Sequence, residues 1–473
     1  MSDKRSHFEE YIYLAGLTHN AAFIGWGGFE FRVKGNPDDE WAIADDLVHH
    51  PQRRGSIGVN SPPLAEEGTL ARIELTNKDN GEVTTQHQAG ANRFHVRDLT
   101  PGTEYTYRIF VKLQGEADVR EWGTGPLRDW EVKDKRRGLR LAGNSYKNEF
   151  RTFPQPDQPA PDLTLAIIGD FGRGVRKPGS KERCQQDIAD ALKQAVEDDG
   201  VRFILTTGDN VYHGGSNDDD WFFTYFQPYR YVINRIPVYP TVGNHDDGED
   251  ESNDDRAQIY DNFFIIPRFT NLKDVQEAST KPGLFYRFRY GSDIEFICLD
   301  TSRRTKLSKR YFRRDQHKEF IDHAFSAAAS PRWRIPFSHH PPYSAGPRHH
   351  NTDSMIEFFI ESGRLRTAGV RVLFSGHEHN FQHTVDEGIN YFVTGGAGEI
   401  RTRVPSTEDF GKAKTTAWGG NEEGHFLLVK INGDRMEVTP RAKRGPNGEP
   451  RVLEIKDIHR NTLEHYAPIE IRL

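Results

Sequence analysis

The pattern of apolar and polar positions changes once along this chain of 473 residues, at a proline-rich segment spanning 154–162. Before it, short runs of β-branched and aromatic residues are separated by Gly, Pro, Asn and Asp, which is typical of strands joined by turns. In the run 103–111, every second residue from Tyr105 onward is apolar or aromatic. Residues 1–153 are therefore predicted to form an all-β domain.

The turn before that run has a recognisable composition. Residues 99–105 read Leu-Thr-Pro-Gly-Thr-Glu-Tyr, which resembles the tyrosine-corner turn of fibronectin type III sandwiches. The resemblance implies a fibronectin type III-like β-sandwich. A different β-sandwich with a Pro-Gly turn would also fit the pattern.

Strand-like and helix-like stretches alternate from residue 163 onward. The mostly apolar run 163–168 indicates a strand buried on both faces, and 180–197 predicts a helix with Ser180 at its N-cap. Further strands are expected at 202–207, 238–242, 294–299, 335–338, 370–375 and 391–394. This alternation predicts an α/β fold class, with a two-layer β-sandwich core flanked by helices over 163–473. Four prolines make 154–162 a stiff, extended linker.

Polar side chains that can bind metal ions follow five of these strands. The carboxyl ends of strands line the ligand crevice of α/β sheets, so we expect the five segments to converge. In chain order they contain Asp170, then Asp209 and Tyr212, then Asn244 and His245, then His339 and His340, and finally His377 and His379. Each segment alone could be an ordinary turn, but their joint occurrence predicts a dinuclear metal site.

Composition narrows the class of protein. The net charge of −7 argues against a nucleic-acid partner, and two cysteines exclude a disulfide scaffold or a cysteine-based zinc site. The sequence contains no run of about 18 apolar residues, so no membrane-spanning helix is predicted. The charged N-terminus lacks the apolar core of a signal peptide. We expect a cytoplasmic location for the chain as written, and a secreted or periplasmic one if the natural chain begins further upstream.

Taken together, the five segments resemble the calcineurin-like metallophosphoesterases. The tyrosine of the second segment resembles the purple acid phosphatase branch, whose plant-type members also carry a fibronectin-like N-terminal domain. The motifs are Asp170-x-Gly172, Gly208-Asp209-x-x-Tyr212, Gly243-Asn244-His245-Asp246, the His339 motif and Gly376-His377-x-His379. The resemblance therefore covers most of the chain.

This resemblance implies two metal ions and a ligand set for each. A ferric ion would be held by Asp170, Asp209, Tyr212 and His379. A divalent ion (iron, zinc or manganese) would be held by Asp209, Asn244, His339 and His377, so Asp209 would bridge. The positive charge of the two ions exceeds the negative charge of their anionic ligands. The site would therefore attract a phosphate ester even though the net charge of the chain is negative. The implied activity is the hydrolysis of phosphate monoesters by a metal-bound hydroxide, as in acid phosphatases.

Four further histidines have implied roles beside the metals. By resemblance, His245 is catalytic: it would stabilise the transition state or protonate the departing alkoxide. His340 could lie behind the ligands, contact substrate or simply be buried. Either His349 or His350 falls where relatives place a histidine on the substrate side, although a solvated loop is the alternative.

Two other functions compete with the phosphatase hypothesis. The first is a phosphodiesterase of the same fold. The second, more remote, is a catalytically dead binding scaffold, which would normally have lost ligand residues. The expected partner is a small-molecule phosphate ester, and a homodimer is possible.

Overall fold

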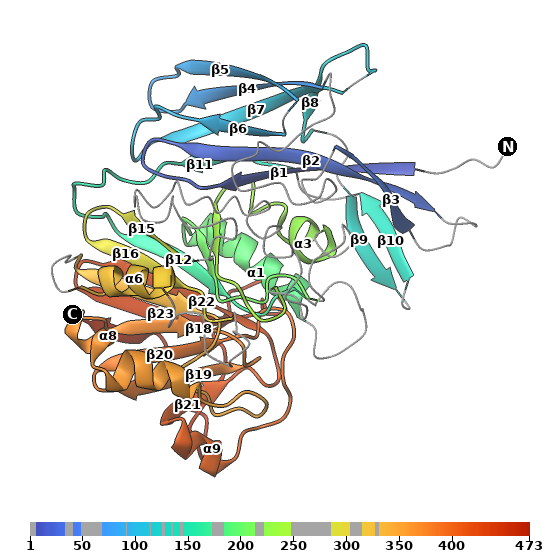
Figure 1. Cartoon of the computed structure of the whole chain (residues 1–473). Coiled ribbons are helices and arrows are strands. Elements are labelled where there is room, and N and C mark those ends of the chain that lie inside the picture. The colour runs from blue at the N-terminus through green and yellow to red at the C-terminus, as the bar shows by residue number, and fades with distance from the viewer. Residues whose placement is uncertain are drawn as a thin grey trace.

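Figure 1 shows the computed structural model of the chain, with most of the N-terminal strands above and the two larger sheets below. The structure describes residues 6–33, 41–48, 69–90, 92–113, 115–124, 128–133, 136–141, 145–172, 184–212, 222–246, 285–302, 315–326 and 331–473. Among these residues, no helix is both long and apolar enough to cross a bilayer.

The N-terminal region is all-β, as predicted. One sheet contains β1 (Ser6–Ala15), β2 (Ala22–Val33), β3 (Trp41–Val48) and β6 (Arg93–Val96). A second contains β4 (Leu70–Asn77), β5 (Val83–Ala89), β7 (Glu104–Lys112), β8 (Arg120–Trp122) and β11 (Glu149–Arg151). A separate hairpin is formed by β9 (Arg128–Lys133) and β10 (Arg136–Leu141). All the pairings in these sheets are antiparallel.

The first two sheets face each other through their tryptophans. Trp26 of β2 and Trp122 of β8 are fully buried and meet edge to face, with ring centroids 5.3 Å apart. Burial alternates along β7, as the sequence pattern requires. The Tyr105 hydroxyl accepts a hydrogen bond from the Thr100 backbone N–H at 2.8 Å, which confirms the tyrosine-corner turn.

Two larger sheets follow. The six-stranded sheet has the order β14 (Val238–Pro240), β13 (Ile204–Thr206), β12 (Leu163–Ile168), β22 (His425–Asn432), β23 (Arg435–Ala442) and β25 (Ile469–Arg472). The eight-stranded sheet has the order β15 (Tyr286–Tyr290), β16 (Ile294–Leu299), β17 (Trp333–Ser338), β18 (Val372–Ser375), β20 (Ile389–Thr394), β19 (Phe381–Asp386), β21 (Thr415–Gly419) and β24 (Ile455–Lys456). Each sheet has a parallel part, β12–β14 and β16–β18 with β20.

Helices cover the outer faces of these two sheets, so the predicted fold class is confirmed. The buried face of α1 (Gln185–Asp198) packs on β22 and β23. On the other side, a separate apolar cluster joins the eight-stranded sheet to α6 (Asp315–Ala324), η5 (Ile356–Glu361) and α8 (Arg364–Thr367). The described residues also form four short helices: η2 (Phe222–Phe226), α3 (Gln227–Tyr229), α7 (Asp353–Met355) and α9 (Thr407–Lys412).

An aromatic seam joins the N-terminal sandwich to the rest of the molecule. We use this name for Phe153, Phe203, Tyr239, Phe288 and Tyr290, which are buried and in ring contact. The centroid of the Phe153 ring lies 5.1 Å from the ring centroid of Tyr290 and 5.7 Å from that of Phe203. One continuous apolar core therefore runs through both regions.

Hydrogen bonds reinforce the seam. The Leu14 N–H donates to the Ile233 carbonyl at 2.6 Å, and the Tyr107 hydroxyl donates to the Asn234 carbonyl at 2.6 Å. The predicted linker is also held, because the Ala160 N–H donates to the Asp293 carboxylate at 2.7 Å. The domain boundaries at 1–153, 154–162 and 163–473 stay a prediction.

Candidate metal centre

The candidate residues lie at the carboxyl ends of parallel strands from both large sheets. Asp170 follows β12 and Asp209 follows β13 in one sheet. His339 follows β17 and His377 follows β18 in the other. A hydrogen bond joins the two edges, since the backbone N–H of His377 donates to the Asp170 carboxylate at 2.9 Å. The site therefore sits where the two layers meet.

The chain turns sharply as it leaves these strands. Asp170, Asp209 and His377 have φ values of 54°, 50° and 72°, in the left-handed region that Asp, Asn and His tolerate better than most residues. Gly208 has a φ of 89°, and a Cβ there would lie 2.6 Å from His339 Nδ1. The glycine thus lets the backbone pass directly under an imidazole.

One group of side chains gathers around the Tyr212 hydroxyl. This oxygen is 3.0 Å from His379 Nε2 and 3.4 Å from Asp170 Oδ1. His379 Nε2 is itself 3.4 Å from Asp170 Oδ1. All three residues are buried.

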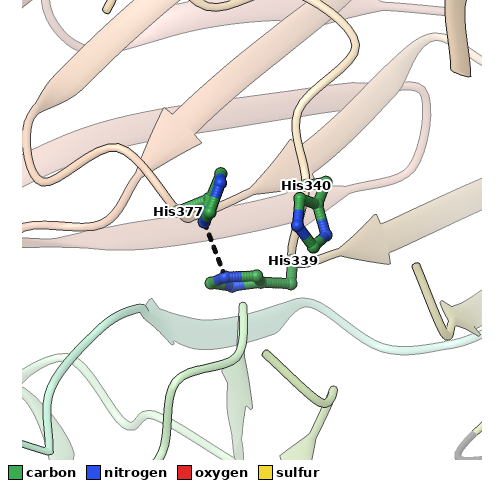
Figure 2. Close-up of side chains that lie close together, drawn as sticks. All are labelled: His339, His340 and His377. Atoms are coloured by element: carbon green, nitrogen blue, oxygen red, sulfur yellow. Dashed lines mark hydrogen bonds between the residues drawn. The ribbon is translucent and has the colours of Figure 1, made fainter. Parts of the chain in front are cut away.

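A second group gathers around His339 Nε2. Asn244 Oδ1 and His377 Nδ1 each lie 3.0 Å away, and Asp209 Oδ1 lies 3.5 Å away. Figure 2 shows the His339 and His377 rings meeting, with His340 beside them. His339 Nδ1 is 2.8 Å from the Thr207 carbonyl, which can only accept. Nδ1 therefore carries the proton, and the lone pair of Nε2 faces the group.

The spacing of these atoms fits metal ions. Donors about 2.1 Å from an octahedral cation lie about 3.0 Å from one another, close to the separations in both groups. The donors are carboxylate, phenol and amide oxygens together with imidazole nitrogens, which suit iron, zinc and manganese. Asp170, Asp209 and His339 also bring ligand atoms within 4.8 Å of one another, which connects the two groups.

The two carboxylates need a positive partner. Burial raises the pKa of Asp170 to about 7. Burial and the neighbouring Asp170 raise the pKa of Asp209 to about 7 as well. Nearby imidazoles and Arg401 oppose the shift only partly. Cations between the carboxylates would remove this cost, so the residues present fit a metal centre.

The carboxylate of Asp246 binds backbone N–H groups of two turns at the site. Its carboxylate accepts the backbone N–H groups of Asn210, Val211 and Gly243 at 2.8–3.1 Å. It thereby ties the turn after β13 to the turn after β14. Asp246 therefore holds these two turns together.

His245 and His340 contact different ligand candidates. The His245 ring packs on Tyr212, with ring centroids 4.6 Å apart. The backbone N–H of His245 donates to Asp209 Oδ1 at 2.9 Å. His340 is buried, with Nδ1 3.2 Å from the Thr301 hydroxyl and its ring 4.4 Å from His377.

His349 and His350 are separated by the structure. The His349 ring stacks on His377 at 3.7 Å between centroids and is partly buried. His350 is 62% exposed, and its Nδ1 lies 3.9 Å from the Asp409 carboxylate. Of the two, His349 is therefore brought to the candidate metal residues.

With this geometry in view, comparisons with known proteins identify the domain. The sequence model of the family described as "Calcineurin-like phosphoesterase" matches residues 163–381. The chain carries a calcineurin-like phosphoesterase domain. With this domain the chain is a metal-dependent phosphoesterase, and its class implies a dinuclear centre.

Proteins similar to this chain include acid phosphatases. Purple acid phosphatase 3 of Arabidopsis thaliana is 26% identical over 274 residues, covering 55% of this chain and 69% of the relative. Tartrate-resistant acid phosphatase type 5 of Mus musculus is 26% identical over 305 residues, covering 59% of this chain and 86% of the relative.

Solved structures extend the likeness to the N-terminal strands. Purple acid phosphatase PPD1 from yellow lupin (Lupinus luteus) seeds has a TM-score of 0.61 at 13% identity, covering 95% of this chain and 74% of that one. The structure of PhoD has a TM-score of 0.60 at 10% identity, covering 96% and 91%. At these identities the likeness concerns the fold alone.

The sequence analysis missed two residues near the candidate ligands, Glu378 and Arg401. Glu378 is fully buried between His377 and His379, and its carboxylate lies 3.1 Å from the Arg401 guanidinium. Burial raises the pKa of Glu378, and Arg401 opposes that shift. The signal available was an acidic residue inside the Gly-His-Glu-His motif, but the sequence does not show which partner it meets.

Proposed function

We propose that the protein hydrolyses phosphate monoesters at a centre of one ferric and one divalent ion, in the manner of an acid phosphatase. The observation that carries the proposal is the pair of donor groups around Tyr212 and His339, connected through the buried carboxylates Asp170 and Asp209. A shared carboxylate suits two ions held close together.

The proposed ligands follow these two groups. Asp170, Tyr212 and His379 would hold the ferric ion, because a phenol oxygen and carboxylates are hard donors. Asn244, His339 and His377 would hold the divalent ion, for which imidazoles are suited, and Asp209 would serve both ions. When bound, such a pair supplies positive charge for the phosphate and lowers the pKa of a coordinated water.

His245 is proposed as the residue that assists the leaving group. It adjoins Asn244 in sequence, its ring rests on Tyr212, and it is only partly buried. From there its imidazole can donate a proton to an alkoxide that departs from phosphorus. The bond from its own backbone to Asp209 fixes the start of the side chain.

His349 is proposed as the substrate-side histidine in preference to His350. Its ring stacks on that of His377, whereas His350 lies beside Asp409. His340 is proposed to support the centre, because it is buried and bonded to Thr301. A homodimer, the absence of a nucleic-acid partner and the compartment stay predictions.

Two measurements on one preparation test the proposal. Chromogenic phosphate monoesters and diesters should be compared, together with metal content and the visible spectrum. Monoester turnover with about two metal ions per chain, one of them ferric iron, is expected. Turnover of diesters alone would make the protein a phosphodiesterase. Fewer than one ion per chain without hydrolysis would favour a binding scaffold.

A further inference from the structure

The carboxylate of Glu378 holds a neighbouring loop by its backbone. Glu378 Oε2 accepts the His349 N–H at 2.7 Å and the Arg348 N–H at 3.2 Å. Glu378 Oε1 lies 3.1 Å from Arg401 Nε. Oε2 of this buried group is therefore hydrogen-bonded twice, whereas Oε1 has an ion pair with Arg401 but no hydrogen bond from the described residues. These contacts restrict the orientation of the carboxylate.

A second contact fastens the same loop nearby. The Asn380 side-chain amide donates to the Gly346 carbonyl at 3.2 Å. Glu378 and Asn380 are two residues apart, and both reach from the segment that carries His377 and His379. The segment 346–349 is thus attached to the segment 377–380 at both ends.

The ring of His349 shows what this attachment achieves. It stacks on His377 with centroids 3.7 Å apart and an interplanar angle of 29°. A histidine on an unattached loop would sample several rotamers and backbone positions, and holding it has an entropic cost. Here the Glu378 carboxylate binds the N–H of the very residue whose ring must be placed.

We propose that Glu378, anchored by Arg401, is the positioning residue that sets His349 against His377 on the substrate side of the site. The inference rests on the proposed function only for the role of His349 in turnover. The placement itself follows from the contacts of Glu378. Because Glu378 is fully buried, it does not contact the substrate itself. Its hydrogen bond to the His349 backbone is the route by which we expect it to affect catalysis.

The first test measures the loop without using activity. Hydrogen exchange of the Arg348 and His349 amides should be compared in the wild type, Glu378→Ala and Glu378→Gln. We expect exchange at these amides to rise at least about tenfold in Glu378→Ala, because two charge-assisted hydrogen bonds are lost. Glu378→Gln keeps an acceptor oxygen and should show a smaller rise. Unchanged exchange in both variants would overturn the proposal.

The second test is a double-mutant cycle on kcat/KM for a phosphate monoester. Glu378→Ala and His349→Ala should each lower kcat/KM about tenfold or more, and the double variant should be no slower than the worse single variant. If the fold-losses in kcat/KM of the two single variants multiply in the double variant, Glu378 does not act through His349. Loss of metal ions in Glu378→Ala would show that Glu378 supports the ligands instead.

A matched control variant and the wild type show whether the proposed function or the positioning role of Glu378 is wrong. Glu423→Ala removes a carboxylate paired with Arg451 at 3.1 Å, outside the site, and should leave exchange and turnover as they were. A wild type that hydrolyses no phosphate ester would refute the proposed function. The amide exchange would then still decide whether Glu378 positions the loop.

Discussion

Single atoms decide how each side chain of the site can act. His339 offers Nε2 because its Nδ1–H is bonded to the Thr207 carbonyl, a partner that no side-chain motif encodes. Tyr212 is 2% exposed, and its hydroxyl lies within 3.4 Å of both Asp170 and His379. A phenol so enclosed by an imidazole and a carboxylate is well placed to bind a cation.

Replacing Tyr212 by Phe tests that arrangement. The variant should lose the visible absorption that arises when a phenolate binds ferric iron, because only the hydroxyl is removed. The fold should survive, since the ring still packs on His245. The absorption spectrum and far-UV circular dichroism of the metal-loaded protein check both points. An unchanged visible band would mean that Tyr212 is not a ligand.

Replacing His245 by Ala separates catalysis from metal binding. We expect kcat to fall about 10²–10⁴-fold, the usual contribution of a positioned general acid. Metal content should stay near that of the wild type, because the bond to Asp209 comes from the backbone of residue 245. Steady-state kinetics and elemental analysis provide the two readings. Equal loss of both would assign His245 a structural role.

The elements that the sequence predicts best are those with the strongest pattern. β12 and β16 have the predicted bounds, 163–168 and 294–299, because both are nearly continuous apolar runs. The helix predicted at 180–197 begins at Gln185 in the structure, whereas 180–183 lie outside the described residues.

Several contacts between elements were not predicted from the sequence. The hairpin β22–β23 was not assigned from sequence, although β22 pairs with β12 in the middle of the sheet. The convergence of ligand candidates followed from their places at strand ends, and the structure brings them together. The choice of His349 over His350, and the partners of Glu378, depend on loop geometry that adjacent residues do not encode.

The two aspartates at the strand ends, Asp170 and Asp209, should make the stability of the metal-free protein depend on pH. Asp170 and Asp209 have pKa values raised to about 7 in the folded chain, against about 3.9 for an unfolded aspartate. As the pH rises above about 4, the unfolded chain releases protons that the folded chain keeps, so stability falls until about pH 7.

Urea unfolding of chelator-treated protein at several pH values measures this trend. We expect the free energy of unfolding to drop by up to about 4 kcal/mol for each of the two carboxylates between about pH 4 and pH 7. Metal-loaded protein should show a smaller drop or none, because bound cations stabilise the ionised carboxylates. Stability that rises with pH in the metal-free protein would contradict the raised pKa values.

At the scale of the whole molecule, the N-terminal sandwich and the phosphoesterase domain share one core. The aromatic seam and the Leu14–Ile233 and Tyr107–Asn234 hydrogen bonds leave no solvent layer between them at those points. We therefore expect both regions to unfold together.

Phe153→Ala tests this coupling. Truncating a buried phenylalanine should cost about 3–5 kcal/mol of unfolding free energy, and a single transition seen by fluorescence and circular dichroism should shift. Phe110→Ala is the control, because that ring is only partly buried and stacks under Arg72. Two separate transitions, only one of them shifted, would show that the regions fold independently.

The aromatic seam also has a consequence for the order in which the chain leaves the ribosome. Phe153 emerges well before its partners Tyr239, Phe288 and Tyr290. At roughly 5–20 residues per second, the interval is on the order of ten seconds. During that time the Phe153 ring lacks the aromatic side chains that bury it in the folded protein. We therefore expect chaperones that bind apolar surfaces to associate with this chain during translation.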